Sequence, residues 1–282
     1  MVRSSDKQAF LITTNVLSNS TVRHYNKLRK AAETYGDVFI LFHSKRNVVP
    51  EKYKNLPIIT FTDDLLRDLN YKPILNAVVP GSNHFPILDF YLKHPEYSSY
   101  WCIENDVDFN GRWDFFFNSI STNSTSDFIS SHIRKYSKAP HWHWWDSFYT
   151  PNKEIKQENL YRSFNPIYKL SNRALQYIDS CLKNGYVGHH EVLFSTLLIN
   201  AGFIVEDLSS INNNFTANLN FCTLQTMRWK PIVLFMGNQK NKLFHPIKPA
   251  LTVKQLLVYI KRVTLSENKY FNTKTTTDLK II

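Results

Sequence analysis

The acidic run Glu104-Asn105-Asp106-Val107-Asp108 contains the residue types best suited to chemistry in this sequence. Its three carboxylates are spaced i, i+2 and i+4, so an extended backbone places them on one face and a tight turn lets them converge on one cation. Carboxylate oxygens are hard ligands that suit Mg²⁺ or Mn²⁺, and these ions also bridge a diphosphate. Asp-x-Asp runs also occur in turns where Asp caps backbone amides, so the run by itself leaves both interpretations open.

The segment just before this run predicts a buried strand that brings the acids to the edge of a sheet. Residues 99–103 (SYWCI) are mostly aromatic or apolar and lead directly into Glu104. Ligands of open α/β sheets bind beyond the carboxyl ends of the strands. This position therefore favours a metal site over a simple turn.

The upstream sequence predicts the sheet to which this strand belongs. Apolar runs predict buried strands, helical periodicity predicts helices, and Gly36 is placed to end the first helix. The expected strands are 9–14, 37–43 and 57–61, and the expected helices are 21–35, 62–69 and 84–92. This order predicts an α/β fold with a mixed, mostly parallel central sheet flanked by helices.

Composition excludes several classes of protein. The 282 residues include only 7 Gly, and neither GxGxxG nor GxxxxGK[ST] occurs, which argues against dinucleotide oxidoreductases and P-loop enzymes. The 3 Cys are widely spaced, as expected for reduced thiols in a cytoplasmic protein. We find neither a signal peptide nor an apolar run of about 18 residues that could span a bilayer. Aromatic residues make up 15% of the chain, which leaves rings for a binding surface.

The segment His141-Trp142-His143-Trp144-Trp145-Asp146 has two functional interpretations. A His-x-His pair can bind Zn²⁺ from one face of a strand, but no third or fourth ligand lies nearby at metal spacing, so we reject zinc. The three Trp rings could instead stack on sugar faces as an acceptor-binding wall. We expect some of these rings to pack against the sheet and the others to line the acceptor cleft.

The C-terminal region is strongly basic. Residues 224–282 contain eleven Lys or Arg and two acidic residues, in a chain whose net charge is +11. Such a region can face anionic lipid, a phosphorylated substrate or nucleic acid, or it can be an ordinary solvated surface. Residues 252–262 (TVKQLLVYIKR) suit a helix that lies on an anionic bilayer, and packing back on the core is an equal alternative.

Several short patches, in order, resemble GT-A-fold glycosyltransferases from bacterial polysaccharide clusters and related eukaryotic proteins. The run from Trp101 to Trp113 (WCIENDVDFNGRW) is similar to their W-x-I-E-x-D-V-x-F-x-G-x-W. Residues 83–90 (NHFPILDF), 165–171 (NPIYKLS), 188–198 (GHHEVLFSTLL) and 244–248 (FHPIK) are similar to further motifs of the family. The resemblance spans about residues 8–250, and Ser195 departs from it by replacing a Pro at a helix start.

The resemblance implies a GT-A domain over residues 1–250, followed by a basic tail over 251–282. It implies a metal-dependent enzyme that uses Mn²⁺ or Mg²⁺ to move a hexose, with galactose as the candidate, from a UDP-sugar. The acceptor would be a glycan or a lipid-linked saccharide in surface-polysaccharide synthesis (lipopolysaccharide or capsule), with no nucleic acid partner. The protein would be cytoplasmic, and it could also contact the anionic inner face of the cytoplasmic membrane peripherally.

The resemblance also implies roles for individual residues. Asp106 and Asp108 would bind the metal as an Asp-x-Asp pair, with Glu104 close behind, and His245 would join them from the far end of the chain. Lys248 would contact the diphosphate as a point charge, although it and His245 could be ordinary loop residues. The residues expected to bind the nucleotide-sugar are Thr13, Thr14, Asn15, Arg46, Asn83, Asp106 and Lys248. Those expected to bind the acceptor are Trp142, Trp144, Trp145 and His190.

Glu191 is the candidate general base. It begins an expected helix, where the positive end of the dipole stabilises a carboxylate, and from there it could take a proton from an acceptor hydroxyl. Helix-start acids act as bases in similar inverting enzymes, so the resemblance implies inversion. A Glu in the first turn can also be a simple helix-stabilising residue.

Three rival functions are open at this point. A nucleic-acid-binding protein would explain the basic charge and the aromatic content, but not the acids at a strand end. A metal-dependent phosphoesterase would use the acidic run with His141 and His143, but needs more convergent ligands than the sequence offers. The third is a non-catalytic glycan-binding relative.

Overall fold

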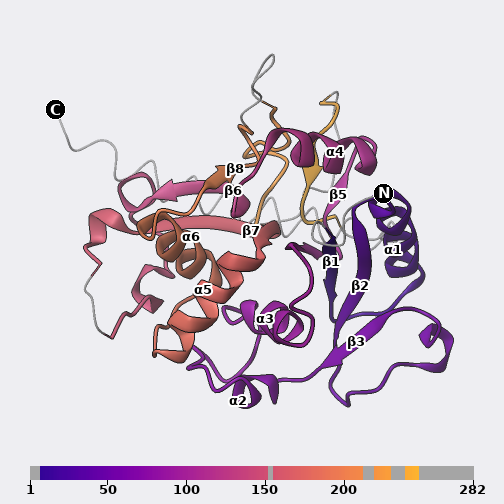
Figure 1. Cartoon of the computed structure of the whole chain (residues 1–282), viewed down its shortest axis with the longest axis horizontal. Coiled ribbons are helices and arrows are strands. Elements are labelled where there is room, and N and C mark those ends of the chain that lie inside the picture. The colour runs from indigo at the N-terminus through magenta and orange to yellow at the C-terminus, as the bar shows by residue number, and fades with distance from the viewer. Residues whose placement is uncertain (1–6, 152–154, 212–218, 230–238, 248–282) are drawn as a thin grey trace, which may run out of the picture.

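The computed structural model describes residues 7–151, 155–211, 219–229 and 239–247, apart from the side chain of Asn123. Seven strands form one central sheet in the order β3-β2-β1-β4-β7-β6-β8 (Figure 1). Their bounds are β1 Gln8–Thr14, β2 Gly36–His43, β3 Ile58–Phe61, β4 Ser99–Glu104, β6 Phe128–Lys135, β7 Tyr161–Ser171 and β8 Val205–Asp207. A second, two-stranded sheet pairs β5 (Asp108–Phe109) with β9 (Leu243–Phe244).

The first four strands of the sheet order are parallel, and β7 reverses the direction. β1 pairs in parallel with both β2 and β4, and β2 with β3, whereas β7 runs antiparallel to its neighbours β4 and β6. β8 pairs in parallel with β6. The carboxyl ends of β1, β2, β3 and β4 therefore meet at one edge, which is where ligands of such sheets bind.

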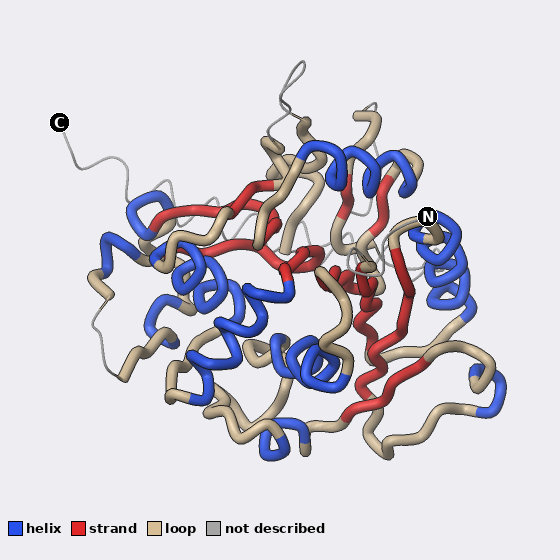
Figure 2. Tube along the Cα trace, viewed as in Figure 1, coloured by secondary structure: helices blue, strands red, loops and turns tan. Residues whose placement is uncertain are grey.

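Helices cover both faces of the central sheet (Figure 2). One face packs against α1 and α4, and the other packs against α2, α3, α5 and α6. The helices span α1 Asn19–Ala32, α2 Leu65–Asp68, α3 His84–Lys93, α4 Trp113–Asn123, α5 Asn172–Lys183 and α6 His190–Asn200. Short 3₁₀ helices occupy Glu51–Tyr53, Tyr136–Lys138, Trp145–Ser147 and Gln157–Asn159.

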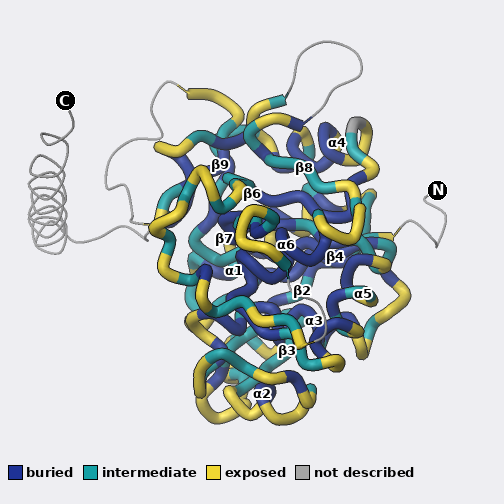
Figure 3. Tube along the Cα trace, turned by 90° about the vertical axis from the view of Figure 1, so that its left-hand side faces the viewer, coloured by how far each residue is buried: buried dark blue, intermediate teal, exposed yellow. Residues whose placement is uncertain are grey.

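The two apolar clusters follow from the alternation of side chains along the strands. In β1, Phe10 and Ile12 join the cluster under α1 and α4, while Ala9 and Leu11 join the cluster under α3, α5 and α6. Both faces of β1 are thus buried, which explains its uninterrupted apolar sequence. Figure 3 shows the buried residues in the interior of the molecule, with exposed residues at its edges. The predicted fold class, a mixed and mostly parallel sheet flanked by helices, is confirmed.

Local sequence signals explain where the elements begin and end. Ser18 caps α1 and accepts a hydrogen bond from the Thr21 N–H, and the basic Arg29 and Lys30 lie in the last turn, where they favour the helix dipole. The sequence predicted a helix over 62–69, but α2 has only four residues of that range. The expected tail helix over 252–262 lies outside the described residues. No helix in the described part of the chain is long and apolar enough to cross a membrane.

Candidate active site

A cavity of about 810 Å³ opens at the carboxyl edge of the parallel strands. Its walls come from the ends of β1 and β4, from the first turns of α1 and α3, and from the turn that carries the acidic run. Lining residues include Thr13, Thr14, Asn15, Arg23, Lys27, His43, Asn83, Glu104, Asp106, Asn165 and His190. This is the position at which the strand order predicts a ligand.

Three side chains converge beside this cavity, and we name them the acid–histidine cluster: Glu104, Asp106 and His245. Each offers one ligand atom, and these atoms all lie within 4.8 Å of one another. The His245 Nε2 atom is 3.1 Å from Glu104 Oε2 and 3.5 Å from Asp106 Oδ1. Two carboxylates and one imidazole form a donor set suited to a divalent cation.

Backbone pairing brings His245 to the acids from the far end of the described chain. Strand β9 pairs with β5, where Phe244 lies opposite Asp108, so the next residue reaches the turn that holds Asp106. The Ile247 N–H donates to the Asp106 carbonyl at 2.7 Å, and the His245 N–H donates to Thr226 O at 2.9 Å. These bonds fix the backbone on both sides of the acid–histidine cluster.

The His245 ring is held by the backbone on the side away from the acids. Its Nδ1 is 2.8 Å from the Arg228 carbonyl, which can only accept, so Nδ1 donates. The Nε2 atom is the ring nitrogen that faces Glu104 and Asp106. A carbonyl that holds the far nitrogen is also the usual support of a metal-bound histidine.

The carboxylate of Asp108 binds Lys27 and is not part of the acid–histidine cluster. Its Oδ1 and Oδ2 accept from Lys27 Nζ at 2.6 and 2.9 Å, and Oδ1 also accepts from the Phe109 N–H at 2.8 Å and from Trp113 Nε1 at 3.3 Å. The structure therefore places Asp106 with Glu104 and His245, and it places Asp108 in an ion pair with helix α1. The carboxylate of Asp108 still lines the cavity.

The cavity wall also carries buried polar atoms that lack a hydrogen-bond partner among the described residues. They are His24 Nε2, Asn83 Oδ1, Asn105 Oδ1, Asn165 Nδ2 and His190 Nδ1. Burial lowers the pKa of His24 and of His190 to about 4, so both rings are neutral at physiological pH. Buried polar groups are normally satisfied, and neutral donors and acceptors at a cavity fit a hydroxyl-rich ligand.

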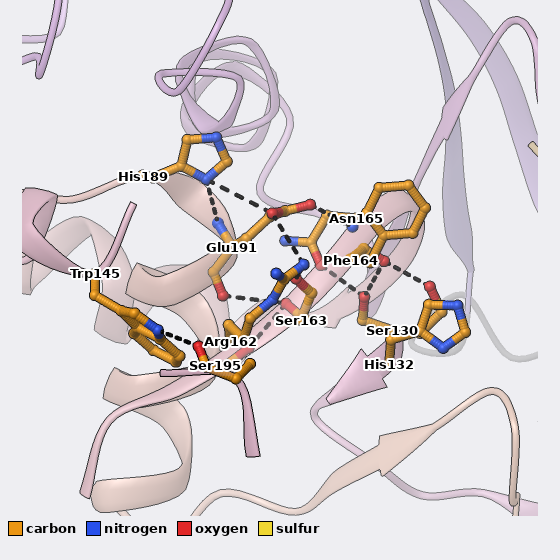
Figure 4. Close-up of polar contacts among 12 residues, drawn as sticks. Ser130, His132, Trp145, Arg162, Ser163, Phe164, Asn165, His189, Glu191 and Ser195 are labelled. Atoms are coloured by element: carbon orange, nitrogen blue, oxygen red, sulfur yellow. Dashed lines mark hydrogen bonds and ion pairs between the residues drawn. The ribbon is translucent and has the colours of Figure 1, made fainter. Parts of the chain in front are cut away.

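Glu191 lies in the first turn of α6 (Figure 4) and is not itself among the lining residues of the cavity, although its neighbour His190 is. Its Oε1 accepts from the Asn165 N–H at 3.2 Å, and its Oε2 is 3.8 Å from Arg162 Nη2 and 4.0 Å from His189 Nδ1. The helix is capped by His189, whose Nδ1 accepts from the Glu191 N–H. Burial raises the pKa of the Glu191 carboxyl to about 7, against the opposing effects of Arg162 and the Asn165 N–H. A carboxyl near neutrality suits proton transfer.

A buried hydroxyl network holds the strand that faces Glu191. Ser130 Oγ donates to the side-chain oxygen of Asn165 at 2.6 Å, and Ser195 Oγ donates to Ser163 Oγ at 2.8 Å. Ser163 Oγ in turn donates to the Glu191 carbonyl at 3.2 Å (Figure 4). The first of these bonds fixes the amide group of Asn165, a residue that lines the cavity.

The three tryptophans of the aromatic segment have different surroundings. Trp145 is buried, packs with Leu160 and Val192, and donates from Nε1 to Ala139 O at 2.8 Å. Trp142 and Trp144 are half-buried and contact the side of the site that holds Arg162 and His189. The ring that packs inward is therefore Trp145.

The other residues expected from the sequence divide into three groups. Thr13, Thr14, Asn15, Asn83, Asp106 and His190 line the cavity. Arg46 is exposed and is not among the lining residues. Lys248 lies outside the described residues, so its predicted contact with a diphosphate stays a prediction.

Sequence reasoning missed several residues that the fold brings to the site. They are Arg23, His24, Lys27, Asn105, Arg162 and Tyr168, of which all but Arg162 line the cavity. The positive charges at positions 23 and 27 lie one turn apart on the expected first helix, which is a signal for a shared face. Arg162 carried no signal, because an Arg near the start of a strand is unremarkable.

Comparison with known proteins gives a limited result. No protein-family model matches the chain, and no curated protein matches it. One solved structure that the comparison finds is described as a putative glucose-1-phosphate thymidylyltransferase from Bacillus anthracis in complex with a sucrose. It has 9% identity and a TM-score of 0.37 over 71% of this chain and 85% of that one. Another is described as a glycosyltransferase involved in the glycosylation of the major capsid of PBCV-1. It has 11% identity and a TM-score of 0.31 over 62% of this chain and 63% of that one.

Proposed function

We propose that this chain is a metal-dependent glycosyltransferase that moves a hexose from a UDP-sugar to a hydroxyl of a glycan or lipid-linked saccharide. The observation that carries the proposal is the acid–histidine cluster at the carboxyl edge of the sheet, with the buried carboxyl of Glu191 next to the cavity-lining residues Asn165 and His190. The sequence resemblance to GT-A enzymes, given above, supplies the reaction class.

Glu104, Asp106 and His245 would hold Mn²⁺ or Mg²⁺. A divalent ion at this place supplies charge neutralisation for a diphosphate leaving group. The chain itself supports such a site by fixing the backbone of Asp106 through the Ile247 N–H and the ring of His245 through the Arg228 carbonyl. Asp108 would hold Lys27 at the rim, where this cation faces the same cavity.

Glu191 would take the proton from the acceptor hydroxyl as its oxygen attacks the anomeric carbon. A base with a pKa of about 7 is partly ionised at neutral pH and strong enough to accept that proton. Direct attack assisted by this base inverts the anomeric configuration. Asn83, Asn165 and His190 would bind sugar hydroxyls with the polar atoms that have no partner among the described residues.

A hexose donor, with galactose as the candidate, and a place in lipopolysaccharide or capsule synthesis follow from the sequence resemblance. The enzyme would then work on the cytoplasmic side of the membrane, with the basic residues 251–282 as the segment that meets anionic lipid.

The first experiment is calorimetric binding of UDP, GDP and CMP with Mn²⁺, repeated with EDTA and with Asp106→Ala. We expect UDP alone to bind, and we expect both EDTA and the substitution to abolish binding. Binding of UDP that is unaffected by both would contradict the metal-dependent role of the acid–histidine cluster. Absence of binding for all three nucleotides would overturn the proposed function.

A further inference from the structure

Arg162 is a buried cation with few partners. Its side chain is 17% exposed, and its distance to the nearest carboxylate, that of Glu191, is 3.8 Å. The Nη2 atom donates to the Ser163 carbonyl at 3.4 Å, and Nε has no hydrogen-bond partner among the described residues. A guanidinium has five N–H donors, so most of its capacity is unused. Desolvation lowers the pKa of Arg162, as expected for a charge that lacks full compensation.

A second arginine lies directly opposite the first. In the antiparallel pair of β6 and β7, Arg134 is the register partner of Arg162, so the two side chains project from the same face of the sheet. Like charges at such positions destabilise a sheet. Among the described residues, no carboxylate lies within ion-pair distance of Arg134. A bound anion between the two arginines would remove this repulsion.

The titratable neighbours of this pair do not supply that anion. The Asp207 carboxylate, near His132, accepts from the backbone N–H groups of Ile133 and Ser209. Burial lowers the pKa of His132 and that of His189, which favours the uncharged form of both rings. Glu191, with its pKa raised to about 7, compensates Arg162 only in part.

Half-buried aromatic rings border the same place. Trp142 stacks on the Arg162 guanidinium, whose central carbon lies 4.3 Å from the ring centroid, and Trp144 stacks on His189 with centroids 4.6 Å apart. Rings next to a cation suit a ligand with one apolar sugar face and one charged substituent. The contact with Trp142 also fixes the orientation of the Arg162 guanidinium.

We propose that the acceptor carries an oxyanion, a carboxylate or a phosphate, that Arg162 and Arg134 bind beside Glu191. The proposal rests on the proposed function, since it describes the acceptor side of the same site. Planar guanidinium groups match the two oxygens of such anions in bidentate pairs. Binding there would place a neighbouring hydroxyl of the acceptor within reach of the base.

The test uses three methyl glycosides that differ at carbon 6, one neutral and two anionic: methyl β-D-glucoside, methyl β-D-glucuronide and methyl β-D-glucoside 6-phosphate. Affinity for the full chain is measured by calorimetry in the presence of Mn²⁺ and UDP. We expect at least one anionic sugar to bind about tenfold or more tightly than the glucoside, and less tightly as salt is added. Preference for the glucuronide or for the phosphate identifies the source of the anion.

Variants separate this role from a structural one. Arg134→Gln and Arg162→Lys should each remove the preference for the anionic sugar while affinity for UDP is unchanged. Lys135→Gln is the matched control, because it removes the same charge from the next residue of β6, which projects to the opposite face and lies near the Tyr161 ring.

Two results would overturn the proposal. The first is equal affinity of the intact protein for the neutral and anionic sugars, including no measurable binding of any of them. The second is a preference for the anion that both arginine variants retain. In either case, metal-dependent UDP binding would leave the proposed function standing, whereas loss of UDP binding in the intact protein would remove that function instead.

Discussion

The carboxylates of the acid–histidine cluster and of Glu191 lie in different environments. Glu104 and Asp106 line the cavity, whereas Glu191 is not a lining residue and directly follows the lining residue His190. Glu104 and Asp106 have side chains that are 34% and 25% exposed, and both face an imidazole nitrogen. Glu191 is 11% exposed, and burial raises its pKa to about 7. All three residues are carboxylic acids, so the environment makes the difference: two are partly exposed beside His245, and the third is a buried carboxyl that can exchange a proton near neutral pH.

The largest expected effect tests the proton-exchanging side of this comparison. Glu191→Gln keeps the size of the side chain and the acceptor for the Asn165 N–H but removes the base, so turnover should fall by about 10²–10⁴-fold. Affinity for UDP with Mn²⁺ should be unchanged, because the acid–histidine cluster is intact. Steady-state kinetics and calorimetry on the same preparation measure both. If the variant instead binds UDP more weakly but turns over at the normal rate once the donor is bound, Glu191 belongs to the donor site.

The second prediction tests the charged side. His245→Ala removes a proposed metal ligand. Loss of a residue that only hydrogen-bonds to a metal ligand lowers metal affinity by roughly 10–100-fold, so Mn²⁺ affinity should fall by more than that here. His43→Ala is the matched control, since it removes another imidazole of the cavity wall that lies 3.2 Å from Asp63 and outside the cluster. Mn²⁺ titration followed by electron paramagnetic resonance gives both affinities. Equal losses in the two variants would mean that the cluster does not bind the metal.

The third prediction uses pH to sharpen the contrast. Because the pKa of Glu191 is raised from 4.5 to about 7, the ionised base is lost as pH falls below 7, and turnover should drop about tenfold per pH unit below that value. A divalent cation at the acid–histidine cluster favours the charged form of a nearby carboxylate, so metal should move this midpoint to lower pH. A pH profile that stays flat from 5 to 8 would remove Glu191 as the titrating base.

The smallest effect is expected at the third acid of the run. Asp108→Asn breaks an ion pair with Lys27 in which the two side chains are 31% and 46% exposed. Such a pair contributes up to about 1 kcal/mol, so the free energy of unfolding in urea should fall by no more than that. Mn²⁺ affinity should match that of the unaltered protein. A large loss of metal affinity would show that Asp108, and not only Asp106, belongs with the ligands.

Local sequence signals were sufficient for most of the fold. The apolar runs of β1 and β4 are buried on both faces, so their pattern predicted them well, whereas β2 is partly buried and β3 is half-buried throughout. Helix α1 followed from its periodicity, but the prediction that Gly36 ends it was wrong, because the helix ends at Ala32 and Gly36 is the first residue of β2. The antiparallel course of β7 was not predictable, since periodicity reports the burial of a strand and not the direction of its neighbours.

For the candidate site, the sequence located the acids and Glu191, and the resemblance added His245 to the acids. The Asp-x-Asp pattern favoured Asp106 with Asp108, whereas the structure groups Asp106 with Glu104 and His245. Whether this group binds metal, and whether Glu191 acts as base, stay predictions. Arg162 was missed because its position next to Glu191 and opposite Arg134 exists only after the chain folds.

The sequence alone determined the strand that ends in acids, the helix that begins at Glu191, and the classes of chemistry that seven glycines exclude. These properties depend on residues that are close together in the sequence, so they can be predicted from the local pattern of apolar and polar residues. The tertiary structure decided which acid faces His245, from a position 141 residues away, and how far burial raises the pKa of Glu191. Ligand geometry and desolvation depend on long-range packing, because both arise only when distant strands meet at one edge of the sheet.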